Sequence, residues 1–322
     1  MTPPVTPDQI RSHTLRNDAV QVTLLSLGCA VQRWQVAGTD VTLGYADPAE
    51  YIRNAPYLGV IVGRVANRIS NARFTLDGET YLLPANLPPH CLHGGSPGFS
   101  HRLWELEPVS QTEARFTLVS EDGDQGFPGT ARAEVRITLD GYALRYDMRV
   151  ATDRPTPINL AQHLYFNLMG TGSVMDHSLQ VAAAQYLPVD GTNTPTGEIL
   201  PVDGTRYDYR TTRSLTDADP QRIGCDASVV LDSGAGPAAT LSAPNGMGLR
   251  LWTDRPTLQI YTTPWLSPQG AALPGQTHEP MTAICLEAQD HADAMTHGFP
   301  SVLHGPETPY RQLTTIEIAP RG

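Results

Sequence analysis

Two segments of the chain each carry one side chain suited to proton transfer. His163 lies within NLAQHLYFNLMG, residues 159–170, and Glu287 ends the apolar run at residues 284–286. An imidazole titrates near neutral pH, and a carboxylate becomes a better base when burial raises its pKa. The two could therefore serve as general acid and general base. Each also has a purely structural interpretation, as a core histidine bonded to a carbonyl group and as a strand-end carboxylate in water.

Three further polar side chains, which could bind a ligand, lie in the stretch 59–95. Asn67 and Arg68 follow a short apolar run, and His93 comes just before two glycines. Between them, an Asp-Gly pair at residues 77–78 joins two alternating segments, which is a strong signal for a β-hairpin. Side chains beside rigid β structure are well held for ligand binding, so we expect these three to contact a ligand.

Two other kinds of chemistry find little support. His90 and His93 have a spacing seen in metal sites, but His90 follows two prolines and the chain has no His-x-His with a nearby carboxylate. No GxSxG nucleophile elbow is present, which argues against a serine hydrolase. We therefore predict no metal site. Surface positions are our interpretation of the remaining histidines, which are His13, His101, His177, His278, His291, His297 and His304.

Charge and composition limit the class of protein. Among 322 residues, 22 Lys and Arg face 33 Asp and Glu, a formal charge of −11. Such a chain repels phosphate backbones and anionic lipid, so we predict no nucleic-acid or membrane partner. The N-terminus has no basic region followed by an apolar one, which predicts a cytoplasmic protein without a signal peptide. Four widely spaced cysteines are expected to be buried free thiols: Cys29, Cys91, Cys225 and Cys285.

Short alternating segments indicate the fold class. Residues 133–139 and 142–150 alternate around a second Asp-Gly pair, and Asn245-Gly246 marks a third hairpin. Apolar residues nowhere recur at helical spacing over three turns, and only residues 47–51 carry a helix-start signal. We therefore predict an all-β protein, a large antiparallel β-sandwich with few short helices, forming a single domain over residues 1–322.

Several motifs together resemble the aldose 1-epimerase (galactose mutarotase) family. The resemblance runs from about Thr14 to Ile318, nearly the whole chain. The motifs that carry it are GRVANRI at residues 63–69, LHGG at 92–95, NLAQHLYFNLMG at 159–170, GCD at 224–226, LQIYT at 258–262 and ICLEAQDHADA at 284–294.

The resemblance implies a fold, an activity and a set of site residues. The fold would be a large antiparallel β-sandwich with a cleft on one face. The activity would be interconversion of the α and β anomers of a free aldose such as glucose or galactose, with no cofactor. Glu287 would act as general base and His163 as general acid, on opposite sides of the sugar. The residues implied in substrate binding are Asn67, Arg68, His93, Asp226 and Gln259. The partners expected are a monosaccharide substrate and at most a second copy in a weak homodimer.

Two departures from the family pattern lie where sugar hydroxyls would be contacted. Asp226 is followed by Ala227-Ser228 rather than a larger polar residue, and Trp265 is bulkier than is common there. The preferred aldose therefore stays open. Two alternatives also stay open: a non-catalytic sugar-binding protein on the same scaffold, and a hexose-6-phosphate epimerase that would use Arg64 with Arg68 to hold the phosphate.

Overall fold

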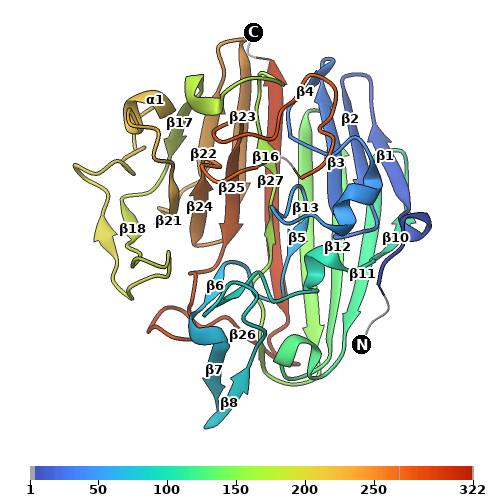
Figure 1. The fold of residues 1–322 in the computed structure, drawn as a ribbon, viewed down its shortest axis with the longest axis vertical. Coiled ribbons are helices and arrows are strands. Elements are labelled where there is room, and N and C mark those ends of the chain that lie inside the picture. The colour runs from blue at the N-terminus through green and yellow to red at the C-terminus, as the bar shows by residue number, and fades with distance from the viewer. Residues whose placement is uncertain (1–3, 268, 321–322) are drawn as a thin grey trace.

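Two large antiparallel sheets build the fold, which the computed structural model describes for residues 4–267 and 269–320. Figure 1 shows their long strands running roughly parallel to the vertical axis of the view. In spatial order the nine-stranded sheet consists of β10 (Glu105–Pro108), β11 (Glu113–Ser120), β12 (Ala131–Asp140), β13 (Ala143–Thr152), β27 (Tyr310–Pro320), β23 (Met247–Thr253), β22 (Ala239–Ser242), β17 (Ser178–Val181) and β20 (Arg213–Ser214). The six-stranded sheet consists of β16 (Tyr165–Phe166), β25 (Ile284–Gln289), β24 (Thr257–Tyr261), β21 (Asp226–Val230), β18 (Gln185–Leu187) and β19 (Leu200–Pro201).

Smaller elements complete the molecule. A four-stranded sheet is formed by β1 (Ser12–Arg16), β2 (Val20–Leu25), β3 (Ala30–Val36) and β4 (Thr39–Asp40). The strand pairs are β5 (Ile61–Val62) with β15 (Ala161–Gln162), β6 (Arg68–Ile69) with β9 (Cys91–Leu92), β7 (Arg73–Leu76) with β8 (Glu79–Leu82), and β14 (Thr156–Pro157) with β26 (Leu303–His304). Helical turns are α1 (Leu215–Ala218) and the 3₁₀ segments Pro7–Gln9, Pro48–Ile52, Ser70–Ala72, Phe99–His101, Asp124–Gly126 and Val174–Asp176.

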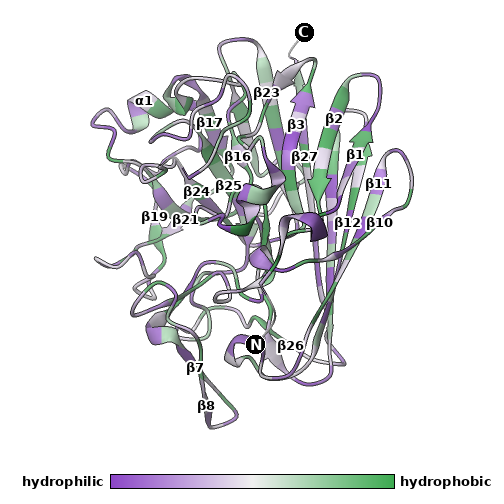
Figure 2. Ribbon diagram, turned by 45° about the vertical axis from the view of Figure 1, so that its right-hand side comes forward, coloured by the Kyte–Doolittle hydropathy of each residue, from purple (hydrophilic) through white to green (hydrophobic). Residues whose placement is uncertain are grey.

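The main hydrophobic core lies between these layers. One continuous cluster joins inward-facing residues of the nine-stranded sheet, such as Val135 and Ile316, to residues of the six-stranded sheet, such as Ile260 and Leu286. Figure 2 shows apolar and polar residues alternating along the long strands. Because side chains of a strand point alternately to its two faces, each long strand turns one face toward this core and the other away from it. The predicted all-β antiparallel sandwich is confirmed.

The free face of the six-stranded sheet is where a site can be built. Register aligns Asp226 with Tyr261 across β21 and β24, and Gln259 with Glu287 across β24 and β25. These side chains alternate with core residues on the same strands, so they share the face that points away from the core. Tyr165 of β16 pairs with Cys285 and extends the row by one strand.

Most local expectations hold. The three hairpins form as β7–β8, β12–β13 and β22–β23, with Asp-Gly or Asn-Gly at each turn. The helix-start signal yields the 3₁₀ segment Pro48–Ile52. The backbone N–H of Ala49 donates to the Asp47 carboxylate at 2.9 Å and caps its first turn. Within the residues described, no helix is long and apolar enough to cross a bilayer.

The expectation of surface histidines is wrong for several positions. His177 is fully buried, and His278 and His291 are nearly so. His177 accepts a hydrogen bond from the backbone N–H of Leu168 at 3.0 Å. The other two pack against aromatic rings, His278 on Tyr45 and His291 on Phe299. These histidines lie between segments that come together only in the folded chain, so no local pattern marks them.

Candidate active site

A cavity of about 310 Å³ opens over the free face of the six-stranded sheet. That volume lies at the lower end of the range for small-molecule sites, roughly 300–1,000 Å³, and suits a ligand of monosaccharide size. All the site residues expected from the sequence line it: Glu287, His163, Asn67, Arg68, His93, Asp226 and Gln259. The structure therefore brings together side chains that are far apart along the chain.

Glu287 and His163 form the floor of this cavity. The Nε2 atom of His163 lies 3.6 Å from the Oε2 atom of Glu287. Their exposed fractions are 2% for Glu287 and 5% for His163, so neither is a solvated surface group. The sequence suggested that Glu287 ends a strand. Instead it lies inside β25, where all residues are buried. Because side chains alternate along a strand, Glu287 points to the face away from its core neighbours Leu286 and Ala288.

Backbone pairing holds His163 in position between β15 and β16. Its N–H donates to Val60 at 2.9 Å, and its carbonyl accepts from Gly59 at 3.0 Å. The apolar run read as a strand in the sequence is therefore the partner that supports the histidine. The imidazole also stacks on Tyr165, with ring centroids 5.2 Å apart. These contacts leave the ring little freedom other than to face Glu287.

Burial raises the pKa of Glu287 and lowers the pKa of His163. Loss of water raises the pKa of Glu287 well above its usual value; the Asp226 carboxylate raises it further, and Arg68 opposes the rise. Burial also lowers the pKa of His163 to about 4. The cause is the same for both, because a charged form is costly away from water. In the free site, both shifts favour the uncharged forms, protonated Glu287 and neutral His163.

Asn67 and His93 are joined by a pair of reciprocal hydrogen bonds. The N–H of Asn67 donates to Nδ1 of His93 at 3.1 Å, and the N–H of His93 donates to the carbonyl of Asn67 at 3.0 Å. Nδ1 is therefore an acceptor, which places the ring proton on Nε2. Burial lowers the pKa of His93 well below its usual value, with His163 and Arg68 adding to the effect. His93 is thus a neutral Nε2–H donor.

Close backbone packing explains the glycine that follows His93. Gly94 has φ +81°, and a Cβ atom there would lie 2.2 Å from the carbonyl oxygen of Gly63. Asn67 also has a positive φ, 64°, a conformation that Asn tolerates better than most residues. The loop carrying His93 can therefore lie against the segment carrying Asn67 only with these residue types.

Four polar side chains form a connected network on the other wall. Gln259 donates to the Asp226 carboxylate at 2.5 Å, and Asn67 donates to the Gln259 carbonyl oxygen at 3.1 Å. The Arg68 guanidinium lies 3.6 Å from Asp226. Burial raises the pKa of Asp226, while Arg68 and Gln259 oppose the rise. The network presents fixed donors and acceptors of the kind that bind hydroxyl groups.

Side-chain amides support the strand that carries Glu287. β16 pairs with β25 only at Ile284 and Cys285, the first residues of β25. Beyond them, side-chain amides bond the backbone of β25 where a neighbouring strand would. Gln162 donates to the Leu286 carbonyl at 2.7 Å, and Gln312 donates to the Ala288 carbonyl at 3.0 Å. Gln162 precedes His163 directly, so one amide links the segments of both floor residues.

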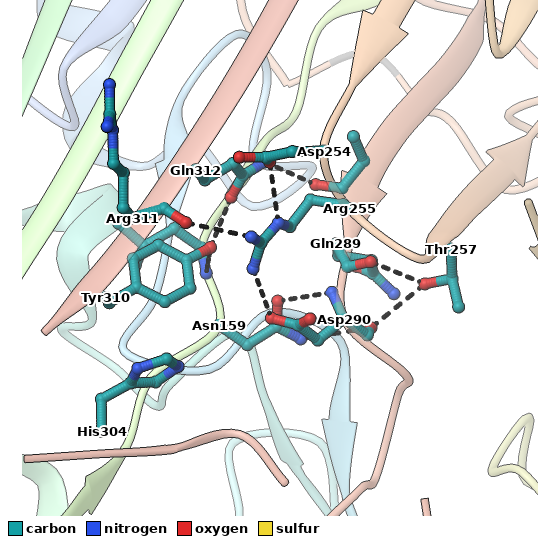
Figure 3. A network of polar contacts seen from close by, with 12 residues as sticks. Asn159, Asp254, Arg255, Thr257, Gln289, Asp290, His304, Tyr310, Arg311 and Gln312 are labelled. Atoms are coloured by element: carbon teal, nitrogen blue, oxygen red, sulfur yellow. Dashed lines mark hydrogen bonds and ion pairs between the residues drawn. The ribbon is translucent and has the colours of Figure 1, made fainter. Parts of the chain in front are cut away.

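A second polar network fixes the far end of the same strand (Figure 3). The Asn159 side chain accepts from the backbone N–H of Asp290 at 2.9 Å. Arg255 reaches the Asp290 carboxylate at 3.0 Å and the Arg311 carbonyl at 3.0 Å. The backbone of Asn159 also bonds to Arg64 and Ala66, just before Asn67. Asn159 therefore connects the two segments that carry Asn67 and Glu287.

Aromatic residues line the cavity wall, and of these only Trp265 was expected from the sequence to lie near sugar hydroxyls. Tyr57 packs on His93 with ring centroids 4.6 Å apart, and Tyr165 and Tyr261 lie beside the floor. Trp265, which is 61% exposed, stacks on Tyr261 at 5.9 Å and stands at the rim. Period-two spacing could have found two of them, since Tyr165 follows His163 by two residues and Tyr261 follows Gln259 by two. Tyr57 has no comparable signal.

The structure separates two residue pairs that the sequence had suggested. Arg64 is 2% exposed and bonds Ser120 and the carbonyls of Pro128 and Glu121, so it does not line the cavity beside Arg68. Burial lowers its pKa to about 10. His90 accepts from the backbone of Asn71 and belongs, like His93, to no cluster of three potential metal ligands among the residues described.

One cluster of potential metal ligands does occur within the described part of the chain. Ligand atoms of His163, Cys285 and Glu287 lie within 4.8 Å of one another, and all three residues are buried. Nitrogen, sulfur and oxygen donors in this combination suit a borderline-soft cation such as Zn²⁺. The cluster coincides with the floor of the cavity and was not expected from the His90/His93 spacing.

Comparisons with known proteins identify the family. The family model described as aldose 1-epimerase matches residues 11–317. Galactose mutarotase of Rattus norvegicus is 38% identical over 96% of this chain and 94% of its own length, and aldose 1-epimerase of Escherichia coli (strain K12) is 35% identical over 92% and 91%. A solved aldose epimerase homologue from C. elegans superposes with a TM-score of 0.92 at 28% identity, over 97% of this chain and all of that one. The chain belongs to the aldose 1-epimerase family.

Proposed function

We propose that Glu287 and His163 carry out the anomer interconversion of this aldose 1-epimerase by moving two protons at the floor of the cavity. The observation that carries the proposal is the buried contact of 3.6 Å between carboxylate and imidazole. The anomeric hydroxyl and the ring oxygen of an aldose are bonded to one carbon. Neighbouring proton-transfer groups therefore suit them better than groups on opposite sides of the sugar, the arrangement expected from the sequence.

In the ring-opening step, the Glu287 carboxylate takes the proton of the anomeric hydroxyl. The His163 imidazolium gives its proton to the ring oxygen while the bond from C1 to that oxygen breaks. The product is the open-chain aldehyde, with Glu287 protonated and His163 neutral. Rotation about the C1–C2 bond exposes the other face of the carbonyl group. Ring closure reverses both proton transfers and gives the other anomer.

The pKa shifts support a reversible cycle of this kind. Protonated Glu287 with neutral His163 is the state that follows ring opening, and burial favours it because both charges are removed. The state that precedes ring opening is the ion pair, which Arg68 and bound hydroxyl groups stabilise by facing the carboxylate. The two states differ by one proton position, so neither is a trap. Positioned acids and bases each contribute roughly 10²–10⁴ in rate.

The remaining wall residues support binding of a neutral sugar. Asp226, Gln259 and Asn67 offer acceptors and donors to hydroxyls, and His93 offers its Nε2–H. Arg68 is the arginine that lines the cavity, and it already faces Asp226. A phosphate dianion would meet that carboxylate and find no second cation among the described lining residues, so we infer that neutral aldoses are preferred over hexose phosphates.

Polarimetry with freshly dissolved sugars tests the proposal. We expect the purified protein to accelerate mutarotation of α-D-glucose, α-D-galactose or α-D-xylose, and the order of the three to identify the preferred aldose. In parallel, kcat/KM for glucose should exceed that for glucose 6-phosphate at equal ionic strength. A clear preference for the phosphate would contradict the inference about neutral sugars.

Two further properties are part of the proposal. We infer a reducing compartment, the cytoplasm, from four buried free thiols with no disulfide. We also propose a single domain, since one family model matches residues 11–317, and a monomer or weak homodimer as its state in solution. Light scattering during size-exclusion chromatography checks the second point.

A further inference from the structure

We propose that the cavity floor is also a binding site for Zn²⁺, formed by His163, Cys285 and Glu287, and that the bound metal inhibits the enzyme. The inference rests on the proposed function, because it assigns the inhibition to the loss of the proton-transfer pair. The proposed proton transfers use only protein side chains, so a metal that binds both of them would inhibit the reaction.

Geometry is the first support. The Nε2 atom of His163 faces Oε2 of Glu287 at 3.6 Å, and the Cys285 sulfur lies within 4.8 Å of both. Bond lengths of about 2.0–2.3 Å in tetrahedral geometry place zinc ligands roughly 3.4 Å apart. The His163–Glu287 separation already meets this spacing, and the Cys285 sulfur, within 4.8 Å of both atoms, lies close to it.

Chain register explains why the third ligand is present. Cys285 and Glu287 are two residues apart on β25, so both side chains leave the same face of the sheet. Tyr165 pairs with Cys285 across the strands, and His163 precedes Tyr165 by two residues. The cysteine therefore lies beside the catalytic pair without lining the sugar cavity. No step of the anomer interconversion uses it.

Chemistry is the second support. One imidazole, one thiolate and one carboxylate form a donor set typical of zinc sites with three protein ligands, and the fourth position would face the cavity. On binding, the Cys285 thiol and any protonated Glu287 release their protons to solvent as the Zn–S and Zn–O bonds form.

Direct titration of the full-length protein tests the site. After dialysis against a chelator, wild type should bind one Zn²⁺ by calorimetry, and Cd²⁺ should produce a thiolate charge-transfer band. Zn²⁺ should inhibit mutarotation competitively with the aldose. Cys285→Ala should lose the Cd²⁺ band and at least about tenfold in Zn²⁺ affinity, while its kcat/KM in chelator stays close to wild type.

Matched variants keep the test decisive. Cys29→Ala removes a buried thiol in the core and should leave Zn²⁺ binding unchanged. Glu287→Gln is inactive by design but should still report weaker binding by calorimetry, even if Cys285→Ala does not fold. Failure of wild type to bind Zn²⁺ or to show the Cd²⁺ band overturns the site, as does unchanged affinity in Cys285→Ala. Neither result bears on mutarotation measured in chelator, which tests the proposed function separately.

Discussion

At the residue scale, the proposed chemistry depends on two groups whose burial disfavours their charged forms. Glu287 and His163 face each other within a floor that water barely reaches. His93 beside them is held neutral, and its Nε2–H is directed by the bond that Nδ1 accepts from Asn67. A general acid, a general base and a neutral donor are therefore distinguished by their surroundings more than by their residue types.

The pH dependence of kcat/KM follows from these shifts. Between about pH 4, where His163 gains a second proton, and the raised pKa of Glu287, the pair holds the one proton that the reaction needs. On the acid side, we therefore expect kcat/KM to fall only on approaching pH 4 and not near pH 6.5, the usual imidazole pKa. The measurement is initial polarimetric rate against pH, after subtraction of the spontaneous reaction. A loss of activity on acidification with its midpoint near 6.5 would show that His163 is not buried as described.

Trp265 tests the rim of the cavity. Its indole is exposed and stacks on Tyr261, so we expect it to cover one face of a bound sugar. Aromatic contacts of this type contribute about 0.5–1.5 kcal/mol, so Trp265→Ala should raise KM roughly 2- to 10-fold with little change in kcat. Tyr142→Ala, an exposed aromatic in the β12–β13 turn, is the control. A change confined to kcat would remove Trp265 from sugar binding.

At the element scale, β25 is positioned by amides as much as by strand pairing. β24 bonds one edge of it, while Gln162, Gln312 and the Asn159 network bond the other (Figure 3). Gln162 is the member of this set next to His163. A displacement of about 1 Å in a catalytic group can cost roughly 10²-fold in rate, so this edge should matter for catalysis although it touches no substrate.

Gln162→Ala tests that edge. Removing the amide leaves the Leu286 carbonyl without its donor, which should lower the free energy of unfolding by about 1–3 kcal/mol. The rate kcat should fall roughly 10- to 100-fold with KM nearly unchanged, because the pair is displaced and the sugar-binding wall is not. Gln180→Ala, an exposed glutamine on β17, is the matched control for stability and rate. If Gln162→Ala is less stable but keeps the wild-type kcat, Gln162 has only a structural role.

At the scale of the whole molecule, acid sensitivity follows from buried histidines. Burial lowers the pKa of His177 to about 4, whereas an unfolded imidazole titrates near 6.5. The similar shift of His163 is opposed by the raised pKa of Glu287 beside it, which binds a proton more tightly in the folded chain. At His177 the unfolded chain binds more protons between pH 4 and 6.5, so this contribution to stability is full above pH 6.5 and is lost as the pH falls toward 4. It amounts to at most about 3 kcal/mol.

Urea unfolding at pH 7 and pH 4.5 measures the effect. We expect a lower free energy of unfolding at pH 4.5, and a smaller difference between the two pH values in His177→Gln. Glutamine can still accept the bond from Leu168, so the substitution removes the titration and keeps the contact. An equal difference in wild type and variant would assign the acid sensitivity to other groups.

Prediction from the sequence succeeded where the pattern is local. Period-two alternation in residues 133–139 and 142–150 and the Asp-Gly and Asn-Gly pairs predicted strands and hairpins that form. Glu287, expected to end an apolar strand, lies inside β25. Motif resemblance supplied the rest of the site residues. What failed depends on tertiary packing. Arg64 is buried against residues 120–128, and Cys285 approaches His163 from a distant strand. The burial of His177 and the position of Tyr57 arise in segments without a regular pattern.

The activity of Glu287→Gln tests the central claim most directly. Glutamine keeps the shape of the side chain but cannot accept the proton, so kcat should fall by roughly 10²–10⁴ with KM little changed. His163→Asn should behave similarly, and the double variant should be far less than multiplicatively worse, because both groups serve one transfer. Circular dichroism and melting temperature show whether each variant is folded. The surface variant Glu279→Gln is the control.

Polarimetric kcat of Glu287→Gln at neutral pH is therefore the measurement that matters most. The predicted result is a folded protein with a saturable but strongly slowed reaction. If the folded variant keeps more than about a tenth of the wild-type kcat, a level well above the expected loss, Glu287 is not the base and the proton-transfer pair proposed here is wrong.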